Sequence, residues 1–152
     1  MKTCAGASAG GHMNQLLRLL DHTASWPCQP SFYVTTLDEL APRLAEKGLV
    51  YVVGECNRNH PLRALRTFVR CLSIARKERP DVVITTGALP LALFCIASKI
   101  YGARIVWIDS IANIEQVSMS GRLVRRFADL FLTQWPELAT NDRKSEYVGA
   151  IL

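Results

Sequence analysis

The sequence lacks the features that mark several classes of protein. No apolar run approaches the roughly 20 residues of a transmembrane helix, and the N-terminus has too little apolar length for a secretory signal. We therefore expect a cytosolic protein. The five cysteines are odd in number, widely spaced and free of any C-x-x-C pair, which argues against a disulfide framework and a zinc site. We expect reduced, buried thiols and no bound metal.

The glycine-rich segment near the N-terminus lacks the residues of the common nucleotide-binding motifs. Gly6 and Gly11 have P-loop spacing, but His12 and Met13 stand where a lysine and a hydroxyl residue would follow. The dinucleotide fingerprint also fails, because Ser8 takes the place of its second glycine and no acidic residue ends the second strand. We expect no cofactor here. What remains is a glycine loop suited to a diphosphate, a sugar or a partner's backbone.

Alternating strand and helix patterns are present along the whole chain. With 152 residues, 49% of them apolar, residues 1–152 predict a single domain with one substantial core. The predicted strands are Lys2–Ala5, Ser31–Thr35, Leu49–Val53, Asp81–Thr85, Arg104–Ile108, Asp129–Thr133 and Glu146–Val148. The predicted helices are Met13–Asp21, Leu37–Lys47, Leu62–Glu78, Pro90–Tyr101 and about Gly121–Ala128. This order predicts an α/β fold, a Rossmann-like, doubly wound parallel sheet with helices on both faces.

Two local signals bear on the helix starts. Thr36 followed by Glu39 predicts a capping box for the second helix, although Pro42 favours a later start near Leu40. Pro90 fits the first turn of the fourth helix.

Ligands of such sheets gather beyond the carboxyl ends of the strands, near the reversal of strand order. This rule selects three loops, Gly6–His12, Thr86–Leu89 and Asp109–Ser120, the last being the most polar.

The net charge of +5 arises from one region, residues 58–79, which holds seven basic residues and one acid. On the predicted third helix Arg63, Arg66 and Arg70 fall within about 60° of one another, beside an apolar stripe. A solvated surface and contact with an anionic bilayer both fit this arrangement. We expect no nucleic-acid contact, because interleaved aromatic residues and base-reading side chains are missing.

An ordered set of short motifs resembles one family. The set is Ala7–His12, Thr86–Ala88, Asp109–Ala112, Ser118–Leu123, Ala128–Phe131, Gln134–Pro136 and Tyr147–Gly149. The sequence is similar to the acceptor-side, membrane-associating subunit of the two-component UDP-GlcNAc transferase of asparagine-linked glycosylation, and more so to the bacterial capsule and exopolysaccharide relatives. The resemblance implies the N-terminal half of a GT-B glycosyltransferase, inactive alone and peripheral on the cytoplasmic face of the membrane. Its partners would be a donor-binding catalytic subunit and a polyprenyl-diphosphate-linked acceptor.

The resemblance, together with the place of these residues on the selected loops and on the basic helix, gives roles to particular residues. Asp109 and His12 are the candidates for the base that accepts the proton of the acceptor hydroxyl. The assigned acceptor or phosphate ligands are Gly10, Gly11, Gly87 and Ser110, the membrane contacts are Arg63, Arg66 and Arg70, and the partner interface is Trp135 and Pro136.

Alternatives stay open for these residues and for the whole chain. Asp109 stands where the family usually has glutamate, and a carboxylate after a strand also caps a following turn. His12 at a helix start also suits a backbone hydrogen bond, and Trp135 also suits a core. For the chain, the alternative is a stand-alone, small Rossmann-like nucleotide-binding enzyme.

Overall fold

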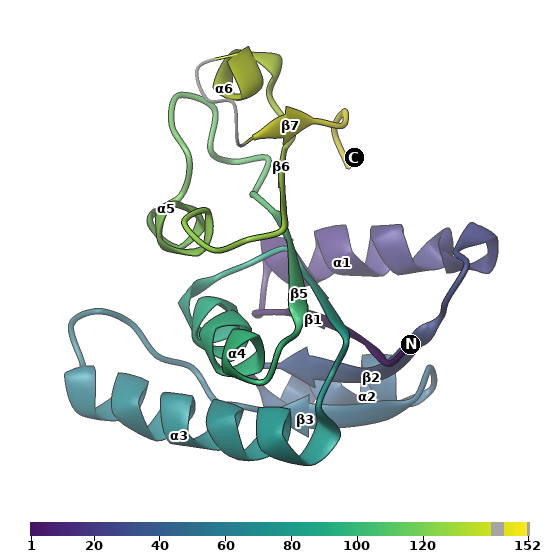
Figure 1. Ribbon diagram of the computed structural model, residues 1–152, viewed down its shortest axis with the longest axis vertical. Helices are drawn as coiled ribbons and strands as arrows, with labels where there is room; N and C mark the ends of the chain where they lie inside the picture. The colour runs from purple at the N-terminus through teal and green to yellow at the C-terminus, as the bar shows by residue number, and fades with distance from the viewer. Residues whose placement is uncertain (141–144, 152) are drawn as a thin grey trace.

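The computed structural model describes residues 1–140 and 145–151. Within these residues one sheet of seven strands has the order β3-β2-β1-β4-β5-β6-β7, and every neighbouring pair is parallel (Figure 1). The strands are β1 (Thr3–Ala7), β2 (Pro30–Thr35), β3 (Leu49–Val52), β4 (Val82–Thr85), β5 (Arg104–Ile108), β6 (Leu130–Thr133) and β7 (Glu146–Tyr147). The predicted fold class is confirmed.

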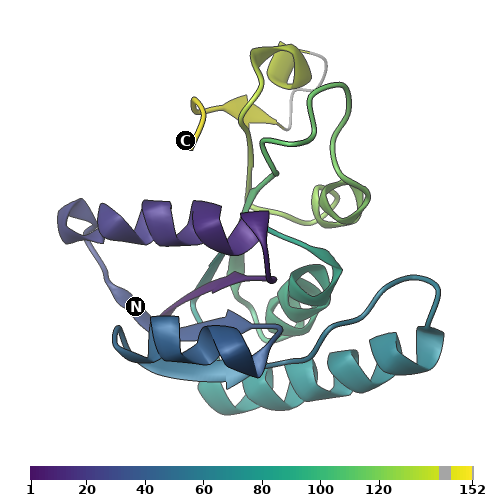
Figure 2. The same ribbon diagram turned by 180° about the vertical axis from the view of Figure 1, so that it is seen from behind.

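Helices cover both faces of the sheet, as Figures 1 and 2 show from opposite sides. The helices are α1 (Gly11–Asp21), α2 (Ala41–Ala45), α3 (Pro61–Glu78), α4 (Leu89–Ile100), α5 (Met119–Val124) and α6 (Pro136–Thr140). On one face, α1 and α2 bury Met13, Leu16 and Leu44 against the strands. On the other face, α3, α4 and α5 share a larger core that includes Phe94 and Trp107.

The strand order reverses between β1 and β4, which are neighbours in the sheet although two strands and three helices separate them in sequence. The β1 strand extends one way to β2 and β3, and β4 extends the other way to β5 and β6. The segments after β1 and β4 lead to helices on opposite faces of the sheet, and ligands of doubly wound sheets bind outside the carboxyl ends of the strands at such a reversal.

Gly6 lies inside β1 and is buried, whereas the sequence analysis placed it in the first loop. An added Cβ there would lie 2.8 Å from Leu91 Cδ1 of α4 and 2.8 Å from the Val34 carbonyl oxygen of β2. The glycine is therefore needed for close packing between strand and helix.

The predicted capping box at Thr36 and Glu39 is wrong. The Thr36 hydroxyl instead accepts the N–H of Ala9 at 3.1 Å, which joins the ends of β1 and β2. A 3-10 turn at Asp38–Leu40 precedes α2, and Pro42 then occupies the second position of that short helix. Pro90 lies in the first turn of α4, as predicted.

The thiols follow the prediction in part. Cys4, Cys71 and Cys95 are buried, while Cys28 and Cys56 are half-buried, and all five are free. Burial raises the pKa of the Cys71 thiol to about 12, so this group stays protonated at neutral pH. Among the described residues, no helix is both long and apolar enough to cross a bilayer.

Candidate functional site

Three hydrogen bonds join the loops that follow β1 and β4 at the reversal of strand order. The Ser8 N–H donates to the Gly87 carbonyl oxygen at 3.0 Å. The His12 Nδ1 lies 2.6 Å from the Thr86 carbonyl oxygen, and the Thr86 hydroxyl donates to the His12 carbonyl oxygen at 2.7 Å. The two loops therefore form one rigid unit at the carboxyl edge of the sheet.

These contacts fix the chemistry of the half-buried His12 ring. A carbonyl oxygen only accepts hydrogen bonds, so Nδ1 must carry the hydrogen in its contact with Thr86. In the neutral imidazole the lone pair is then on Nε2. Gly87 makes room for the ring, because a Cβ at this position would lie 3.0 Å from His12 Cε1.

Gly10 and Gly11 lie at the start of α1. Gly10 has a φ of 82°, a left-handed conformation that favours glycine, and added Cβ atoms at both positions would meet open space. In the described structure the helix has no side-chain cap and no acidic residue in its first turn. The first turn therefore presents backbone N–H groups and the positive end of the helix dipole at an open surface.

Asp109 follows β5, is only 2% exposed and has donors at both carboxylate oxygens. Oδ1 accepts the Ser118 hydroxyl at 2.5 Å and the Trp107 indole N–H at 3.1 Å. Oδ2 accepts the Ser118 N–H at 2.9 Å, with the Asn113 amide 3.4 Å away. Within the described structure no hydrogen bond or ion pair joins Asp109 to His12. This geometry favours a role in shaping the loop, and the assignment of Asp109 as a base stays a prediction.

The loop between Asp109 and α5 is tied down at further points. The Ser118 hydroxyl caps α5 by accepting the Gly121 N–H at 2.8 Å. The Ser110 hydroxyl accepts the N–H of Ala112, so it starts a turn within the loop.

Residues after β6 hold the same loop from the other side. The Trp135 indole donates to the Ile111 carbonyl oxygen at 2.7 Å. The buried Gln134 amide donates to the Asp109 carbonyl oxygen at 2.9 Å and to the Gln15 side chain of α1 at 2.7 Å. Trp135 is thus half-buried with a structural contact, and its predicted partner contact stays untested.

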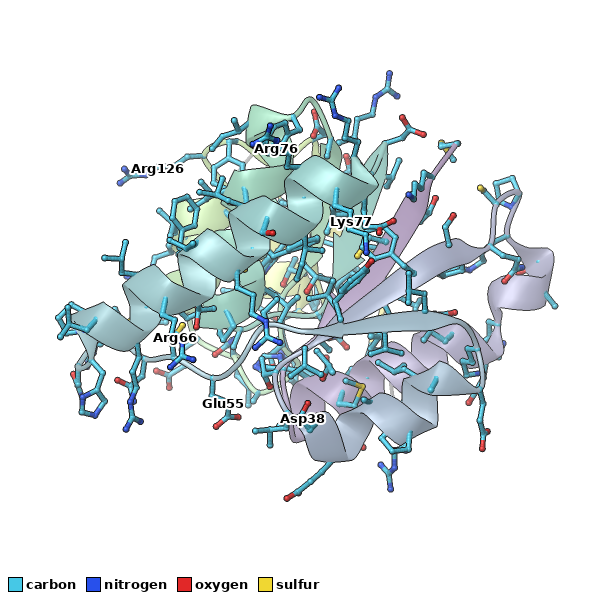
Figure 3. The ribbon with its side chains drawn as sticks, turned by 90° about the horizontal axis from the view of Figure 1, so that it is seen from below. Asp38, Glu55, Arg66, Arg76, Lys77 and Arg126 are labelled. Atoms are coloured by element: carbon cyan, nitrogen blue, oxygen red, sulfur yellow. The ribbon has the colours of Figure 1, made fainter. Side chains whose placement is uncertain are left out.

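The outer surface of α3 is apolar as well as basic. Leu62, Leu65 and Val69 are 81%, 59% and 57% exposed. Figure 3, which looks onto α3, shows Arg66 and Arg76 projecting from the helix. We call Leu62, Leu65, Val69, Arg63, Arg66 and Arg70 the α3 surface. The helix packs inward through a different face, which consists of Thr67, Cys71, Ile74, Ala75 and Glu78.

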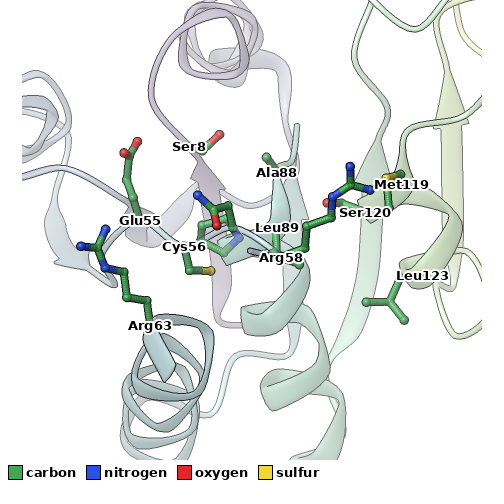
Figure 4. Close-up of a pocket in the computed structure, with 12 residues that line it drawn as sticks. Ser8, Glu55, Cys56, Arg58, Arg63, Ala88, Leu89, Met119, Ser120 and Leu123 are labelled. Atoms are coloured by element: carbon green, nitrogen blue, oxygen red, sulfur yellow. Dashed lines mark hydrogen bonds between the residues drawn. The ribbon is translucent and has the colours of Figure 1, made fainter. Parts of the chain in front are cut away.

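A pocket of about 600 Å³ lies at the N-terminal ends of α3 and α4 and is closed on one side by α5 (Figure 4). Its lining combines apolar and charged side chains: Leu89, Pro90, Leu123 and Met119 with Glu55, Arg58 and Arg63. Arg58 extends across the pocket, with its Nη1 3.2 Å from the Met119 sulfur. The predicted residues His12, Gly10 and Asp109 are not part of this lining.

The comparisons with known proteins show the family of this chain. Residues 50–151 match the model of the family described as oligosaccharide biosynthesis protein Alg14 like. The chain belongs to the Alg14 family. The predicted resemblance is confirmed.

Several relatives carry the name UDP-N-acetylglucosamine transferase subunit ALG14. The Eremothecium gossypii protein is 29% identical over 95% of this chain and 77% of its own length, and the human protein is 22% identical over 96% and 81%. The Yarrowia lipolytica protein is 26% identical over 66% of this chain, but the match spans only 49% of that relative.

Solved structures share the fold of this Alg14-family chain. MurG from Acinetobacter baumannii superposes with a TM-score of 0.78 at 14% identity, over 97% of this chain and 46% of MurG. UDP-GlcNAc 2-epimerase from Methanocaldococcus jannaschii gives a TM-score of 0.73 at 12% identity, over 98% of this chain and 45% of that protein. The chain thus corresponds to just under half of each of these molecules.

Sequence reasoning found the loops of this Alg14-family site but missed several of its contacts. It assigned no contact to Thr86, Trp107, Ser118 or Gln15, which hold the predicted residues in place, although Thr86 and Ser118 lie in the selected loops and motifs. It also missed Met119 and Leu123 of α5, which are 59% and 39% exposed beside the pocket. The motif Ser118–Leu123 was a signal for the α5 contacts. A backbone hydrogen bond of His12 was among the alternatives, but nothing local in the sequence indicated that its partner is Thr86.

Proposed function

We propose that this chain, as a single domain over residues 1–152, is the acceptor-binding subunit of a UDP-sugar transferase that builds a lipid-linked oligosaccharide or exopolysaccharide. The observation that carries the proposal is the match of an Alg14-family chain, over nearly its whole length, to just under half of MurG. The names of its relatives, which call them transferase subunits, support a separate partner that binds the nucleotide sugar.

The α3 surface supports an acceptor held at a membrane. Three exposed apolar side chains at positions 62, 65 and 69 are costly in water and suit the interior of a lipid leaflet. Arg63, Arg66 and Arg70 lie on the same helix and suit the phosphates of anionic lipids, each adding about 1 kcal/mol of attraction. A partly apolar, partly cationic helix of this kind lies on a bilayer rather than through it.

The residues at the carboxyl ends of β1 and β4 support the chemistry of an inverting transfer. The acceptor hydroxyl would attack the anomeric carbon of the UDP-sugar and give its proton to His12 Nε2, whose lone pair the Thr86 contact leaves available. The bond between the sugar and UDP would break, and UDP would leave with the bonding electrons. Gly10 and Gly11 would bind acceptor phosphate at the start of α1. Asp109 would keep the third loop in shape.

Flotation with lipid vesicles tests the membrane part of this proposal. We expect the chain to float with vesicles of phosphatidylglycerol and to stay largely behind with vesicles of phosphatidylcholine. Arg66→Gln should weaken binding to the anionic vesicles by about fivefold, the share of one basic residue at a membrane surface. Leu65→Gln combined with Val69→Gln should weaken it further, because both side chains are exposed in the free protein.

Arg18→Gln is the matched control, since it removes one charge from α1 on the opposite face of the sheet. Equal recovery of the wild-type protein from both vesicle types, or an equal loss in Arg18→Gln and Arg66→Gln, would contradict membrane contact through α3.

A further inference from the structure

Arg58 lines the pocket and makes no ion pair among the described residues. Its guanidinium carries five N–H donors, yet the contact that the structure gives it is a thioether, the sulfur of Met119 at 3.2 Å. A thioether is a weak acceptor, so this contact stabilises the position of Arg58 only slightly. The side chain is also exposed, and it spans the pocket between the loop after β3 and helix α5 (Figure 4).

A second cation lines the same pocket. Arg63 stands on the α3 side, in the first turn of the helix, and no ion pair involves it within the described residues. The pocket also contains the carboxylate of Glu55, which makes no ion pair with either arginine in the described structure. Two arginines and one glutamate leave the pocket with a net positive charge.

Most of the remaining lining is apolar, although Ser8, Asn57 and Ser120 also contribute to it. Leu89 and Pro90 form the wall at the start of α4, and Met119 and Leu123 form the wall at α5. Arg63 on the third wall belongs to the α3 surface. A volume of about 600 Å³ is within the usual range for small-molecule sites. Arg63 and the exposed side chains of Met119 and Leu123 thus place the pocket next to the α3 surface.

We propose that this pocket binds an amphiphile with a phosphate or diphosphate head and an apolar chain, and that Arg58 acts as a strap over it. On binding, Arg58 exchanges the Met119 sulfur for a phosphate oxygen, and Arg63 contacts the phosphate from the opposite wall. The exchange is favourable because a hydrogen bond between two charged groups is far stronger than one to a thioether. This inference rests on the proposed function, since it adds Arg58 and Arg63 to the phosphate contacts of the same acceptor and assigns the pocket to its apolar chain. Ser8, which lines the pocket, lies two residues before Gly10.

Calorimetric titration of the full chain with farnesyl diphosphate, below its micellar concentration, tests the proposal. We expect Arg58→Gln and Arg63→Gln each to weaken binding by about tenfold, the effect of losing one charge-assisted hydrogen bond. Arg76→Gln is the matched control, because Arg76 is exposed on the same helix and does not line the pocket. Met119→Leu should retain binding, because it keeps the apolar wall and removes only the resting partner of Arg58.

Two further probes separate the head from the chain. Inorganic diphosphate and farnesol should each bind at least about tenfold more weakly than farnesyl diphosphate, since each lacks half of the recognised chemistry. Unchanged farnesyl diphosphate binding in Arg58→Gln, or equal affinity for inorganic diphosphate, would overturn the proposal.

The vesicle experiment distinguishes a failure of this inference from a failure of the proposed function. A chain that floats with anionic vesicles but is indifferent to Arg58→Gln loses only the pocket. A chain that binds farnesyl diphosphate through Arg58 but never floats keeps the pocket and loses the membrane surface.

Discussion

Gly6 lies at the centre of the sheet, where β1 contacts β2 and the first turns of α4. A methyl group there would lie 2.8 Å from both the Val34 carbonyl oxygen and Leu91 Cδ1, and the backbone oxygen has little freedom to move. We expect Gly6→Ala to lower the unfolding free energy by about 1–3 kcal/mol, the usual cost of overpacking a core. The change in unfolding free energy is measured by urea denaturation. Gly11→Ala is the control and should leave the midpoint unchanged or raise it, because its Cβ would meet open space in a helix.

Asp109 and His12 differ in what their surroundings allow them to do. Asp109→Asn should lower the unfolding free energy by about 1–3 kcal/mol, because the amide cannot accept both Ser118 donors.

His12→Gln keeps a donor for the Thr86 carbonyl but has no basic lone pair. It should leave stability nearly unchanged and lower sugar transfer, measured with a donor-binding partner, by about 10²–10⁴-fold. An Asp109→Asn variant that folds with wild-type stability and loses transfer to that extent would instead make Asp109 the base.

At the scale of elements, the C-terminal end of α3 is attached to the sheet through Glu78. The buried carboxylate pairs with Lys2 at 2.6 Å and accepts the Tyr51 hydroxyl at 2.5 Å, and these contacts hold the pKa of Glu78 below its ordinary value of 4.5. The lowered pKa means that this stabilisation is complete above about pH 4.5 and is lost as the pH falls through the folded-state pKa.

Urea midpoints at pH 7 and pH 3 test the role of Glu78. The wild-type protein should lose more stability between these two values than Glu78→Gln, which has no carboxylate to protonate. Glu46→Gln removes an exposed carboxylate just after α2 and should behave as the wild type does. The same loss in all three proteins would show that the Glu78 contacts contribute nothing to the pH dependence.

The elements also show what the sequence could predict. All seven strands were predicted. Most of them are short runs of Val, Ile and aromatic residues bounded by turns, which carry a strong local signal, although β1 and the two-residue β7 lack such a run. The second helix was predicted too long, since the hydroxyl of Thr36 serves a contact with Ala9 rather than a helix cap. Contacts of this kind join residues far apart in sequence, and local patterns do not reveal them.

The candidate site was predictable in place but not in detail. The carboxyl ends of parallel strands share one edge, so the three loops had to lie together. The partners of the Asp109 carboxylate lie within nine residues of it, whereas the partner of His12 lies 74 residues away, in the loop after a neighbouring strand. The sequence indicated the apolar and basic stripes of α3, but it did not show that Leu62, Leu65 and Val69 are exposed. The buried face of α3 consists of Thr67, Cys71, Ile74, Ala75 and Glu78, and Leu65 and Val69 lie outside it.

At the scale of the whole molecule, we propose that the fold forms one wall of a reaction crevice. The loops after β1, β4 and β5 meet at one edge of the sheet, and the chain matches just under half of MurG. A donor-binding domain on another polypeptide would close the crevice over His12 and bring the UDP-sugar to the acceptor. The α3 surface would lie on the membrane, and the pocket beside Arg58 would hold the acceptor next to this crevice.

Sugar transfer by the purified chain, alone and mixed with a separate donor-binding subunit, tests this account most directly. The assay follows labelled GlcNAc from UDP-GlcNAc to a polyprenyl-diphosphate-linked acceptor in vesicles. The account predicts no transfer by the chain alone and restored transfer on mixing, lost again with His12→Gln. Turnover by the chain alone at about 1–10³ per second, the range of complete enzymes, would contradict it.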